Sequence, residues 1–186
     1  VRAAEESLQR LQTDYIDLYQ SHTDDADTPL EETFEAYAQL IQQGKVRVIG
    51  ASNFSAERLL QALDVSQQKG YPSYQSLQPF YNLYDRAEYE TKLEPLCREK
   101  GLGVISYFSL ASGFLTGKVR SEKDLAKSAR AQRVGKYLND RGFRILEALD
   151  RVAQERESYP ATVALAWLMA RPGITAPIAS ATSLEQ

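Results

Sequence analysis

The sequence has 186 residues, of which 43% are hydrophobic, so it can form one sizeable core, and we expect one domain over residues 1–186. Charged residues make up 25% and the formal net charge is −3, with both signs interleaved, which argues against nucleic acid and anionic membranes as partners. One cysteine and one histidine provide neither an intrachain disulfide nor a zinc-type ligand cluster, so we expect no metal.

The first part of the chain changes from a helical to a strand pattern and back. Residues 1–11 predict a helix, and YIDLYQ at 15–20 predicts a strand. Thr28 and Pro29 then predict the N-cap and the first residue of a second helix, and Gly44 predicts its end. We therefore expect a strand between two helices.

The same alternation follows directly. VRVIGAS at 46–52 is short and rich in β-branched residues, which predicts a strand buried on both faces. Ser55 is placed to cap a helix that carries Leu59, Leu60 and Leu63 on one side.

The second half of the chain continues this pattern around one long interruption. Residues 109–141 are polar and contain several glycines, and this segment is too long for an ordinary connection, so we consider it a candidate functional loop. The other elements that we expect are strands at 74–80, 103–108 and 174–180, helices at 88–100, 142–156 and 162–170, and the first turn of a further helix at 182–186.

Five short apolar strands that alternate with helices predict an α/β fold with a parallel sheet. An open doubly wound sheet remains an alternative, although the chain lacks the GxGxxG string of a dinucleotide-binding domain. The other interpretation is a (β/α)8 TIM barrel of which this chain holds roughly strands 4 to 8. Since Val1 already lies within a helical pattern, we expect flanking segments, because five barrel strands alone would leave two unpaired sheet edges.

The sequence also predicts a location. No apolar run approaches the ~20 residues that span a bilayer. The first residues are charged, without the apolar centre of a signal peptide. We therefore expect a cytoplasmic protein, while its oligomeric state, including a homo-oligomer, stays open.

Polar or aromatic residues follow every predicted strand, where a barrel places its reactive groups. His22 follows the first strand, and Ser52 and Asn53 end the second. Gln78 lies at the end of the third and Tyr107 at the end of the fourth. These residues therefore form one candidate site.

Five strings carry a resemblance to a known family. In chain order they are LQTDYIDLYQSH, GKVRVIGASNFS, LQPFYNLYDR, SYFSLASGFLTGK and APIASATSLEQ, and together they span nearly the whole chain. They resemble successive blocks of the aldo-keto reductases, in the branch that includes bacterial general reductases and potassium-channel β subunits. The resemblance implies a (β/α)8 barrel that binds NADP(H) in an extended pose.

His22 matches the family's active-site histidine, which hydrogen-bonds the carbonyl of the substrate. A neutral imidazole suits this role because it donates a hydrogen bond without adding a fixed charge. The resemblance also implies that Ser52, Asn53 and Gln78 hold the nicotinamide carboxamide, since amide side chains both donate and accept. Tyr107 matches the aromatic residue that stacks on the nicotinamide ring.

The resemblance further implies where the rest of the cofactor binds. The backbone N–H groups of 110–113 are the better candidates for the pyrophosphate, because Phe108 and Ser109 replace the serine and proline of many relatives. Arg130 is the first candidate for a phosphate contact from the long loop. The cofactor residues that we expect here are Ser109, Leu110, Ser112, Gly113, Leu115 and Arg130, and, around the adenosine phosphate, Ser180, Thr182 and Gln186.

Together these matches predict NADPH-dependent reduction of aldehydes or ketones by the intact protein, with a small carbonyl compound as substrate. The alternative is a cofactor-sensing regulatory subunit of the channel β-subunit type with little turnover. The family's general acid is a tyrosine assisted by a lysine and an aspartate. No block of this chain matches these three residues, so no proton donor is assigned to it.

Overall fold

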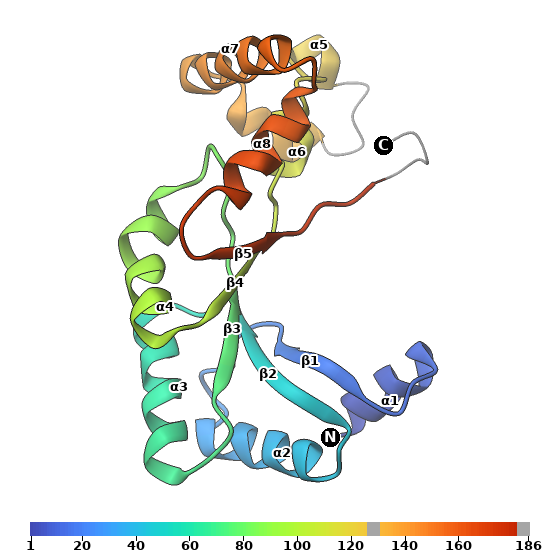
Figure 1. Ribbon diagram of the computed structural model, residues 1–186, viewed down its shortest axis with the longest axis vertical. Coiled ribbons are helices and arrows are strands. Elements are labelled where there is room, and N and C mark those ends of the chain that lie inside the picture. Colours follow the sequence, from blue (N-terminus) through green and yellow to red (C-terminus); the bar gives the residue numbers. More distant parts are fainter. Residues whose placement is uncertain (126–130, 182–186) are drawn as a thin grey trace. The chain divides into compact units, whose positions relative to one another are not determined.

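The computed structural model describes residues 1–125 and 131–181, and it divides into two compact units that are described separately (Figure 1). Unit 1 comprises Val1–Pro79 and Lys92–Val104, and unit 2 comprises Phe80–Thr91 and the described residues from Ile105 onward. The sequence predicted one domain over 1–186, and that assignment stays a prediction.

The elements follow the order that the hydrophobic pattern predicts. The first half contains α1 (Arg2–Leu11), β1 (Ile16–Ser21), α2 (Leu30–Gln42), β2 (Val46–Ser52), α3 (Ala56–Lys69) and β3 (Tyr74–Gln78). It is followed by η1 (Tyr89–Leu93), α4 (Glu94–Lys100), β4 (Gly103–Ser106), η2 (Ala111–Thr116), α5 (Glu122–Leu125), α6 (Ala131–Val134), η3 (Gly135–Tyr137), α7 (Asp140–Glu155), α8 (Pro160–Met169) and β5 (Ile174–Pro177). No helix among the described residues is long and apolar enough to cross a membrane.

The strands form one five-stranded sheet in the order β1-β2-β3-β4-β5, and β1–β2, β2–β3 and β3–β4 pair in parallel. A parallel sheet with helices between consecutive strands confirms the predicted α/β class. Which barrel strands these five represent stays a prediction.

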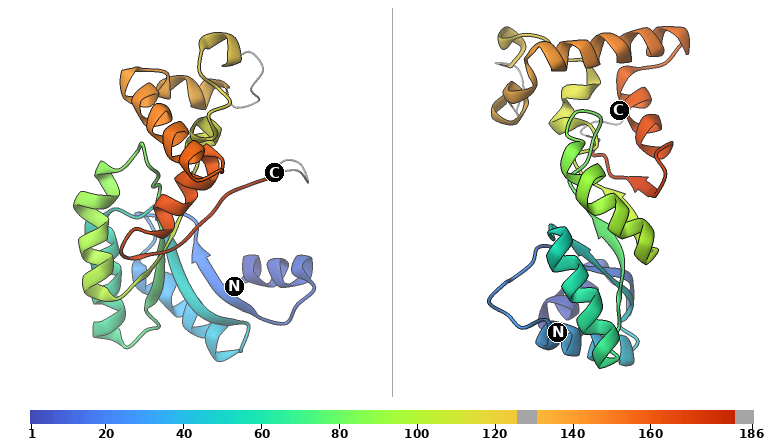
Figure 2. Two further views of the ribbon diagram at one scale, coloured as in Figure 1. Left: turned by 45° about the horizontal axis from the view of Figure 1, so that its top comes forward. Right: turned by 90° about the vertical axis from the view of Figure 1, so that its left-hand side faces the viewer.

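In unit 1, α2 and α3 pack beside β1–β3 (Figure 2). The contacts centre on the buried Tyr74 ring of β3, which lies 5.2 Å from Phe34 and 6.2 Å from Tyr37 of α2, measured between ring centroids. Leu59 and Leu63 are buried on α3. Burial of these large side chains, at about 25 cal/mol per Å² of apolar surface, is the main force that holds the helices to the strands.

Strand β3 carries one extra residue relative to β2. Ile49 pairs with Tyr74 and the next residue, Gly50, pairs with Ser76, so Gln75 has no partner in β2. Side chains alternate between the faces of a strand, and a bulge shifts that alternation by one residue. The bulge therefore places Leu77 on the same helix-covered face as Tyr74 and leaves Gln78 on the opposite face.

Unit 2 has a core of its own. Its buried members come from the segment after β4, from α7 and from α8, and they are Ala111, Phe114, Leu115, Val119, Val134, Tyr137, Leu146, Leu149 and Ala164. The rings of Phe114 and Tyr137 stack with centroids 5.2 Å apart. Residues 109–141, predicted to be a polar functional loop, thus supply six of the nine core members, five of them from short helical turns and Val119 from the irregular stretch between them.

Two predictions about burial were wrong in detail. Val48 is 40% exposed although β2 was expected to be buried on both faces, because α2 and α3 cover only one face of the sheet in this unit. Leu60 is 38% exposed, so the buried side of α3 carries Leu59 and Leu63 without it.

Two predicted helix starts also differ from the structure. Pro29, rather than Thr28, is the N-cap of α2, and the Thr28 hydroxyl donates to Asp25 Oδ2 at 2.7 Å. The helix expected at 88–100 begins with the wider π-turn η1, and α4 starts only at Glu94. Pro95 has no N–H for the carbonyl four residues earlier, which disfavours a regular α-helical turn at that point.

The close packing at the start of α7 predicts that Gly142→Ala destabilises the protein. An added Cβ would collide with the Tyr137 carbonyl oxygen and lie 2.9 Å from Phe114 Cζ. We expect a loss of about 3 kcal/mol in the free energy of unfolding, measured by urea denaturation. The matched control is Gly135→Ala, whose Cβ would meet only Leu125 Cδ1 at 3.7 Å. Equal stability of the two variants would contradict this prediction.

Candidate functional site

The carboxyl ends of β1, β2 and β3 meet at one edge of the sheet in unit 1. Ser21 pairs with Ala51, and Ser52 pairs with Gln78. Because the strands are parallel and in register, His22, Ser52, Asn53 and Gln78 all lie at this edge. The structure thus brings together the four predicted site residues that belong to unit 1.

Hydrogen bonds link these residues to one another. Asn53 Nδ2 donates to the His22 backbone oxygen at 2.7 Å and to Ser52 Oγ at 3.2 Å. Ser52 Oγ in turn donates to the Gln78 backbone oxygen at 2.9 Å. Ser52 is buried, whereas Asn53 and His22 are exposed. Sequence reasoning left Ser52 and Asn53 free for ligands, but the structure gives both a part in joining the three strand ends.

Asn53 adopts a left-handed backbone conformation, with φ at +57°. Asparagine accepts this region more readily than most residues. The sharp turn brings the chain from β2 directly into α3, whose N-cap Ser55 accepts a hydrogen bond from Arg58 N at 3.1 Å, as the sequence predicted.

A hydroxyl cluster that the sequence did not predict anchors the end of β1. Ser21 Oγ lies 2.6 Å from Tyr37 Oη and 2.8 Å from Tyr74 Oη. Burial raises the pKa of both tyrosines, so their hydroxyls stay protonated and able to donate. The residue just before His22 is therefore fixed to α2 and β3.

The loop after His22 is fixed as well. Arg58 Nε lies 2.9 Å and 3.0 Å from the two carboxylate oxygens of Asp24, and both side chains are mostly buried. This ion pair ties the loop after β1 to the first turn of α3, so the backbone on both sides of His22 is held in place.

In unit 2, Tyr107 follows β4 within a group of aromatic rings. It pairs with Phe80 in an isolated parallel bridge, and their ring centroids lie 5.7 Å apart. Phe108 lies 5.3 Å from Tyr107 and 5.6 Å from Phe80. The Tyr107 ring is partly buried, which raises the pKa of its hydroxyl and leaves part of the ring accessible.

The turn after Tyr107 has an unusual backbone. Phe108, Ala111 and Ser112 all have positive φ values, of +53°, +49° and +59°. A right-handed residue followed by a left-handed one can direct N–H groups into a concave turn that suits an anion. This turn contains left-handed residues, and phosphate binding by it stays a prediction.

Some donors of this turn are already engaged. The N–H groups of Gly113 and Leu115 both donate to the Leu110 oxygen, at 2.8 Å and 3.2 Å. The buried Ser109 hydroxyl donates to the Ser106 oxygen at 3.1 Å, and the Leu115 side chain is fully buried. Among the predicted residues, this leaves the N–H groups of Leu110 and Ser112 as the better candidates for an anion.

The sequence model of the Aldo/keto reductase family matches residues 1–186. The chain belongs to this family. It is 37% identical over its whole length to an uncharacterized oxidoreductase, YrpG, of Bacillus subtilis, and covers 55% of that protein. Over 98% of the chain it is 32% identical to the L-glyceraldehyde 3-phosphate reductase of Escherichia coli, and covers 54% of it.

A third relative is named as a channel subunit, whereas the first two are named as an oxidoreductase and a reductase. The chain is 31% identical over its full length to a protein of Arabidopsis thaliana named probable voltage-gated potassium channel subunit beta, and covers 58% of it. The chain therefore spans about half the length of the curated relatives that it matches.

The last predicted cofactor residues of this aldo/keto reductase chain are only partly described. Ser180 is exposed in the segment after β5, where the Ile178 N–H donates to the Ser106 oxygen at 2.8 Å. Arg130, Thr182 and Gln186 lie outside the described residues.

Several tyrosine hydroxyls of this chain lie in surroundings that disfavour their ionised form. Burial is the main cause that raises the pKa of Tyr37, Tyr74, Tyr81, Tyr107 and Tyr137, and the hydrogen bond to Glu35 is the main cause for Tyr71. Within the described residues, no group of three or more His, Cys, Asp or Glu side chains could hold a metal ion.

An ion network in unit 2 was not predicted. The Glu90 carboxylate accepts hydrogen bonds from Tyr81 Oη at 2.7 Å and from Arg86 Nε at 2.9 Å, and Arg171 Nη2 lies 3.4 Å from it. Glu90 thus joins the segment after β3 to the turn before β5. Burial raises its pKa, but hydrogen bonds from Arg86 and Tyr81 outweigh this effect and hold the pKa below its usual value.

A second polar cluster supports the same segment. The fully buried Asn82 accepts the backbone N–H groups of Tyr84 and Asp85 through Oδ1, both at 2.9 Å. Asp85 Oδ2 accepts from Asn82 Nδ2 at 3.1 Å and from Tyr137 Oη at 2.7 Å. Asn82, one of the polar residues after the third strand, therefore holds the loop in shape.

The left-handed backbone of Asn53 leads to a paired prediction. Asn53→Ala loses the amide hydrogen bonds and also strains the backbone at φ +57°, whereas Asn53→Gly loses only the bonds. We expect the alanine variant to be less stable than the glycine variant by about 1 kcal/mol in urea denaturation. A glycine variant no more stable than the alanine variant would contradict the role of this conformation.

The lowered pKa of Glu90 predicts how stability changes with pH. The network contributes stability above the unfolded-state pKa of glutamate, about 4.3, and this contribution is lost as pH falls through the lower folded-state value. Glu90→Gln should lower the free energy of unfolding by about 2 kcal/mol at pH 7 and should lose less stability than the parent below about pH 4. Urea denaturation at several pH values measures both effects.

The control for this prediction is Glu147→Gln, which alters an exposed carboxylate on α7. It should leave both the stability at pH 7 and its pH dependence unchanged. A Glu90→Gln variant that follows the parent at every pH would rule out the stabilising role of the network.

Proposed function

We propose that the full-length protein reduces aldehydes or ketones to alcohols with NADPH. The observation that carries this proposal is the hydrogen-bonded set at the carboxyl ends of β1–β3, in which Asn53 joins His22 to Ser52, and Ser52 joins Gln78. These are the residues for which the family resemblance implies binding of the nicotinamide and of the carbonyl group.

The proposed scaffold is a (β/α)8 barrel in which the present strands are strands 4 to 8 and residues 1–186 form part of a single barrel domain. The strand order β1 to β5, with parallel pairing from β1 to β4, supports it, since consecutive strands of such a barrel are neighbours. In this arrangement the polar strand ends lie on the face that carries the active site in barrel enzymes.

The residues present fit a nicotinamide dinucleotide. The amides of Asn53 and Gln78 can complement a carboxamide, and the partly buried Tyr107 ring offers a flat surface for the nicotinamide. Leu110 and Ser112 lie in a turn whose positive φ values suit a pyrophosphate. When bound, the cofactor supplies the hydride. Ser109, Gly113, Leu115 and Ser180, with Arg130, Thr182 and Gln186 outside the described residues, complete the proposed set.

His22 is the proposed catalytic residue of this chain. Its backbone is held by Asn53 from one side and through Ser21 from the other, so the Cα from which the imidazole extends is fixed. From there it would donate a hydrogen bond to the substrate carbonyl oxygen and polarise it as the hydride arrives at carbon. We assign the proton donor to a tyrosine outside these 186 residues.

Further parts of the proposal concern the setting of the reaction. We place the protein in the cytoplasm with a small carbonyl compound as its substrate, and leave self-association open. A phosphorylated aldehyde belongs in the substrate panel, because a relative 32% identical to the chain is named L-glyceraldehyde 3-phosphate reductase.

The alternative function is a cofactor-sensing subunit with little turnover. The relative named probable voltage-gated potassium channel subunit beta favours it. The two functions differ in one measurable property, because a sensor binds NADPH tightly without oxidising it in the presence of carbonyl compounds.

The test is NADPH oxidation by the full-length protein with a panel of aldehydes and ketones, with His22→Ala as the diagnostic variant. Loss of a hydrogen-bond donor to the developing oxyanion should lower kcat about 100-fold. The Kd for NADPH, measured by fluorescence titration, should stay within about twofold, because His22 is proposed to contact the substrate. NADPH binding without turnover on any carbonyl would support the sensor, and absence of binding would refute both functions.

A further inference from the structure

A groove on the surface of unit 2 lies outside the proposed cofactor site. It has a volume of about 460 Å³. Its walls come from α7, α8 and the segment after β3, and its lining residues are Leu83, Arg86, Arg141, Arg144, Ile145, Ala148, Leu149, Val152, Val163 and Trp167. None of them belongs to the residues proposed to hold the cofactor or the substrate.

The groove has an apolar floor. Leu149 is buried, while Ile145, Val152 and Val163 are half-buried and extend the apolar surface of the core to the outside. The half-buried Trp167 ring contacts Tyr81, with centroids 5.8 Å apart. Partly exposed apolar side chains that line a concave surface are typical of ligand sites, whereas scattered ones are not.

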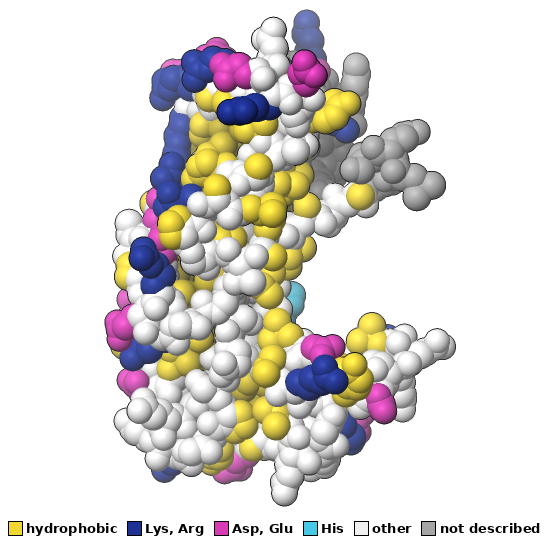
Figure 3. All heavy atoms as spheres, in the orientation of Figure 1, with side chains coloured by type: hydrophobic (Ala, Val, Ile, Leu, Met, Phe, Trp, Pro, Cys, Tyr) yellow, Lys and Arg dark blue, Asp and Glu magenta, His cyan; other side chains and the backbone are white. Residues whose placement is uncertain are grey.

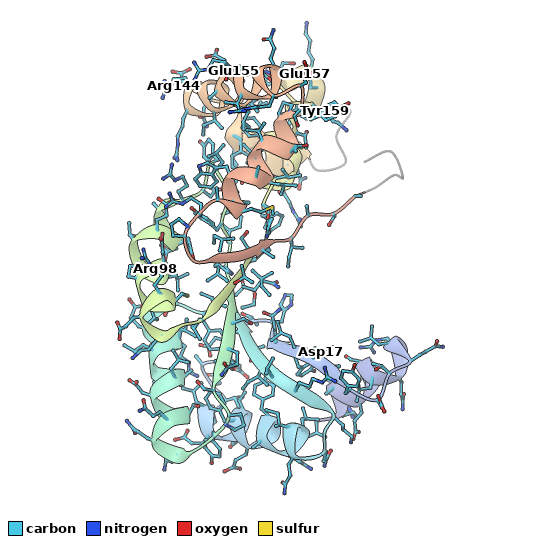
Figure 4. The ribbon with its side chains drawn as sticks, viewed as in Figure 1. Asp17, Arg98, Arg144, Glu155, Glu157 and Tyr159 are labelled. Atoms are coloured by element: carbon cyan, nitrogen blue, oxygen red, sulfur yellow. The ribbon has the colours of Figure 1, made fainter. Side chains whose placement is uncertain are left out.

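The charged residues that line the groove all have the same sign, since three arginines and no carboxylate line it. Figure 3 shows basic side chains gathered along the edge of the part that contains α7, beside apolar ones. Arg86 is paired with Glu90, and Arg141 donates to the Tyr84 oxygen at 2.6 Å and lies over the Tyr84 ring. Arg144 extends outward from α7 (Figure 4) and has no hydrogen bond or ion pair with any residue that the structure describes.

We propose that this groove binds a small amphipathic anion, a molecule with an apolar chain or ring and one monoanionic head group. The apolar floor would take the body, and Arg144, with Arg141 one turn away on α7, would take the head group. Guanidinium groups suit this role because they pair with carboxylates through two parallel hydrogen bonds. The charge complementarity selects an anion, and the volume lies within the range of small-molecule sites, about 300–1,000 Å³.

The first experiment is calorimetric titration of the full-length protein with dodecanoate below its micelle concentration. Dodecyltrimethylammonium, which has the same chain and the opposite charge, is the ligand control. We expect saturable binding of dodecanoate at one site and no such binding of the cation. Equal binding of both amphiphiles would mean adsorption to apolar surface alone and would overturn the proposal.

The second experiment localises the site. Arg144→Glu should weaken dodecanoate binding about tenfold, because it replaces an attractive charge with a repulsive one. The matched control is Arg151→Glu, which makes the same exchange at an exposed position of α7 that does not line the groove. Its affinity should stay within about twofold of the parent. Equal weakening by both variants would leave only a general charge effect and would overturn the proposal.

A third variant tests the apolar floor without a change of charge. Ala148 is exposed and lines the groove, so Ala148→Trp should fill the space without disturbing the core. Saturable binding should be lost, while the far-ultraviolet circular dichroism spectrum and NADPH binding stay unchanged. Undiminished affinity in this variant would place the ligand elsewhere and refute the groove. Since NADPH binding is measured separately, failure here is distinguishable from failure of the proposed reductase function.

Discussion

The hydrogen bond from Asn53 Nδ2 to the His22 backbone oxygen is the contact on which the proposed chemistry depends. It spans the ends of two neighbouring strands and fixes the residue proposed to orient the substrate. Asn53 can make it only because its backbone turns sharply at a positive φ. The Ser52 hydroxyl, bonded to the Gln78 oxygen, extends the link to a third strand. Two adjacent polar residues at the end of β2, Ser52 and Asn53, thus link the ends of β1, β2 and β3.

Unit 2 relies on a different kind of constraint. Its segment after β3 buries the rings of Tyr81 and Tyr89, and two carboxylates hold the polar groups of the segment. The Glu90 carboxylate contacts the side chains of Tyr81, Arg86 and Arg171. Asp85 accepts a hydrogen bond from the buried Tyr137 hydroxyl. An unpaired carboxylate in such surroundings would be costly, so each one is surrounded by donors. In this segment, polar contacts therefore act together with apolar packing, whereas the packing around Tyr74 in unit 1 is mainly aromatic.

Most of the elements could be predicted from the sequence because their signals are local. β2 occupies the residues 46–52 that its β-branched pattern indicated, and Ser55 caps α3 as expected. The α/β class followed from the alternation of short apolar strands with helices, and the family from the five strings that carry the resemblance. The exposure of single side chains was harder to predict. Val48 and Leu60 are apolar, but no neighbouring element that the structure describes covers them. The Gln75 bulge and the π-turn η1 had no clear local pattern.

The candidate site could be predicted as a list of residues but not as a network. Ser21, Tyr37 and Tyr74 meet although 16 and 53 residues separate Ser21 from the two tyrosines, and nothing local indicates such a contact. The burial of apolar residues in the segment after β4 was missed for a related reason. Phe114, Leu115 and Tyr137 are spaced without helical or strand periodicity, so their burial depends on α7 and α8, which come later in the chain.

The unpaired residue in β3 has a structural consequence of its own. Strict alternation along a short strand would tie the orientation of its last side chain to that of its first. By absorbing one position, Gln75 uncouples them, so that Tyr74 and Leu77 can serve the packed interior while Gln78 is left to face a different environment. A strand of five residues thereby carries both buried packing residues and the side chain proposed to bind the cofactor.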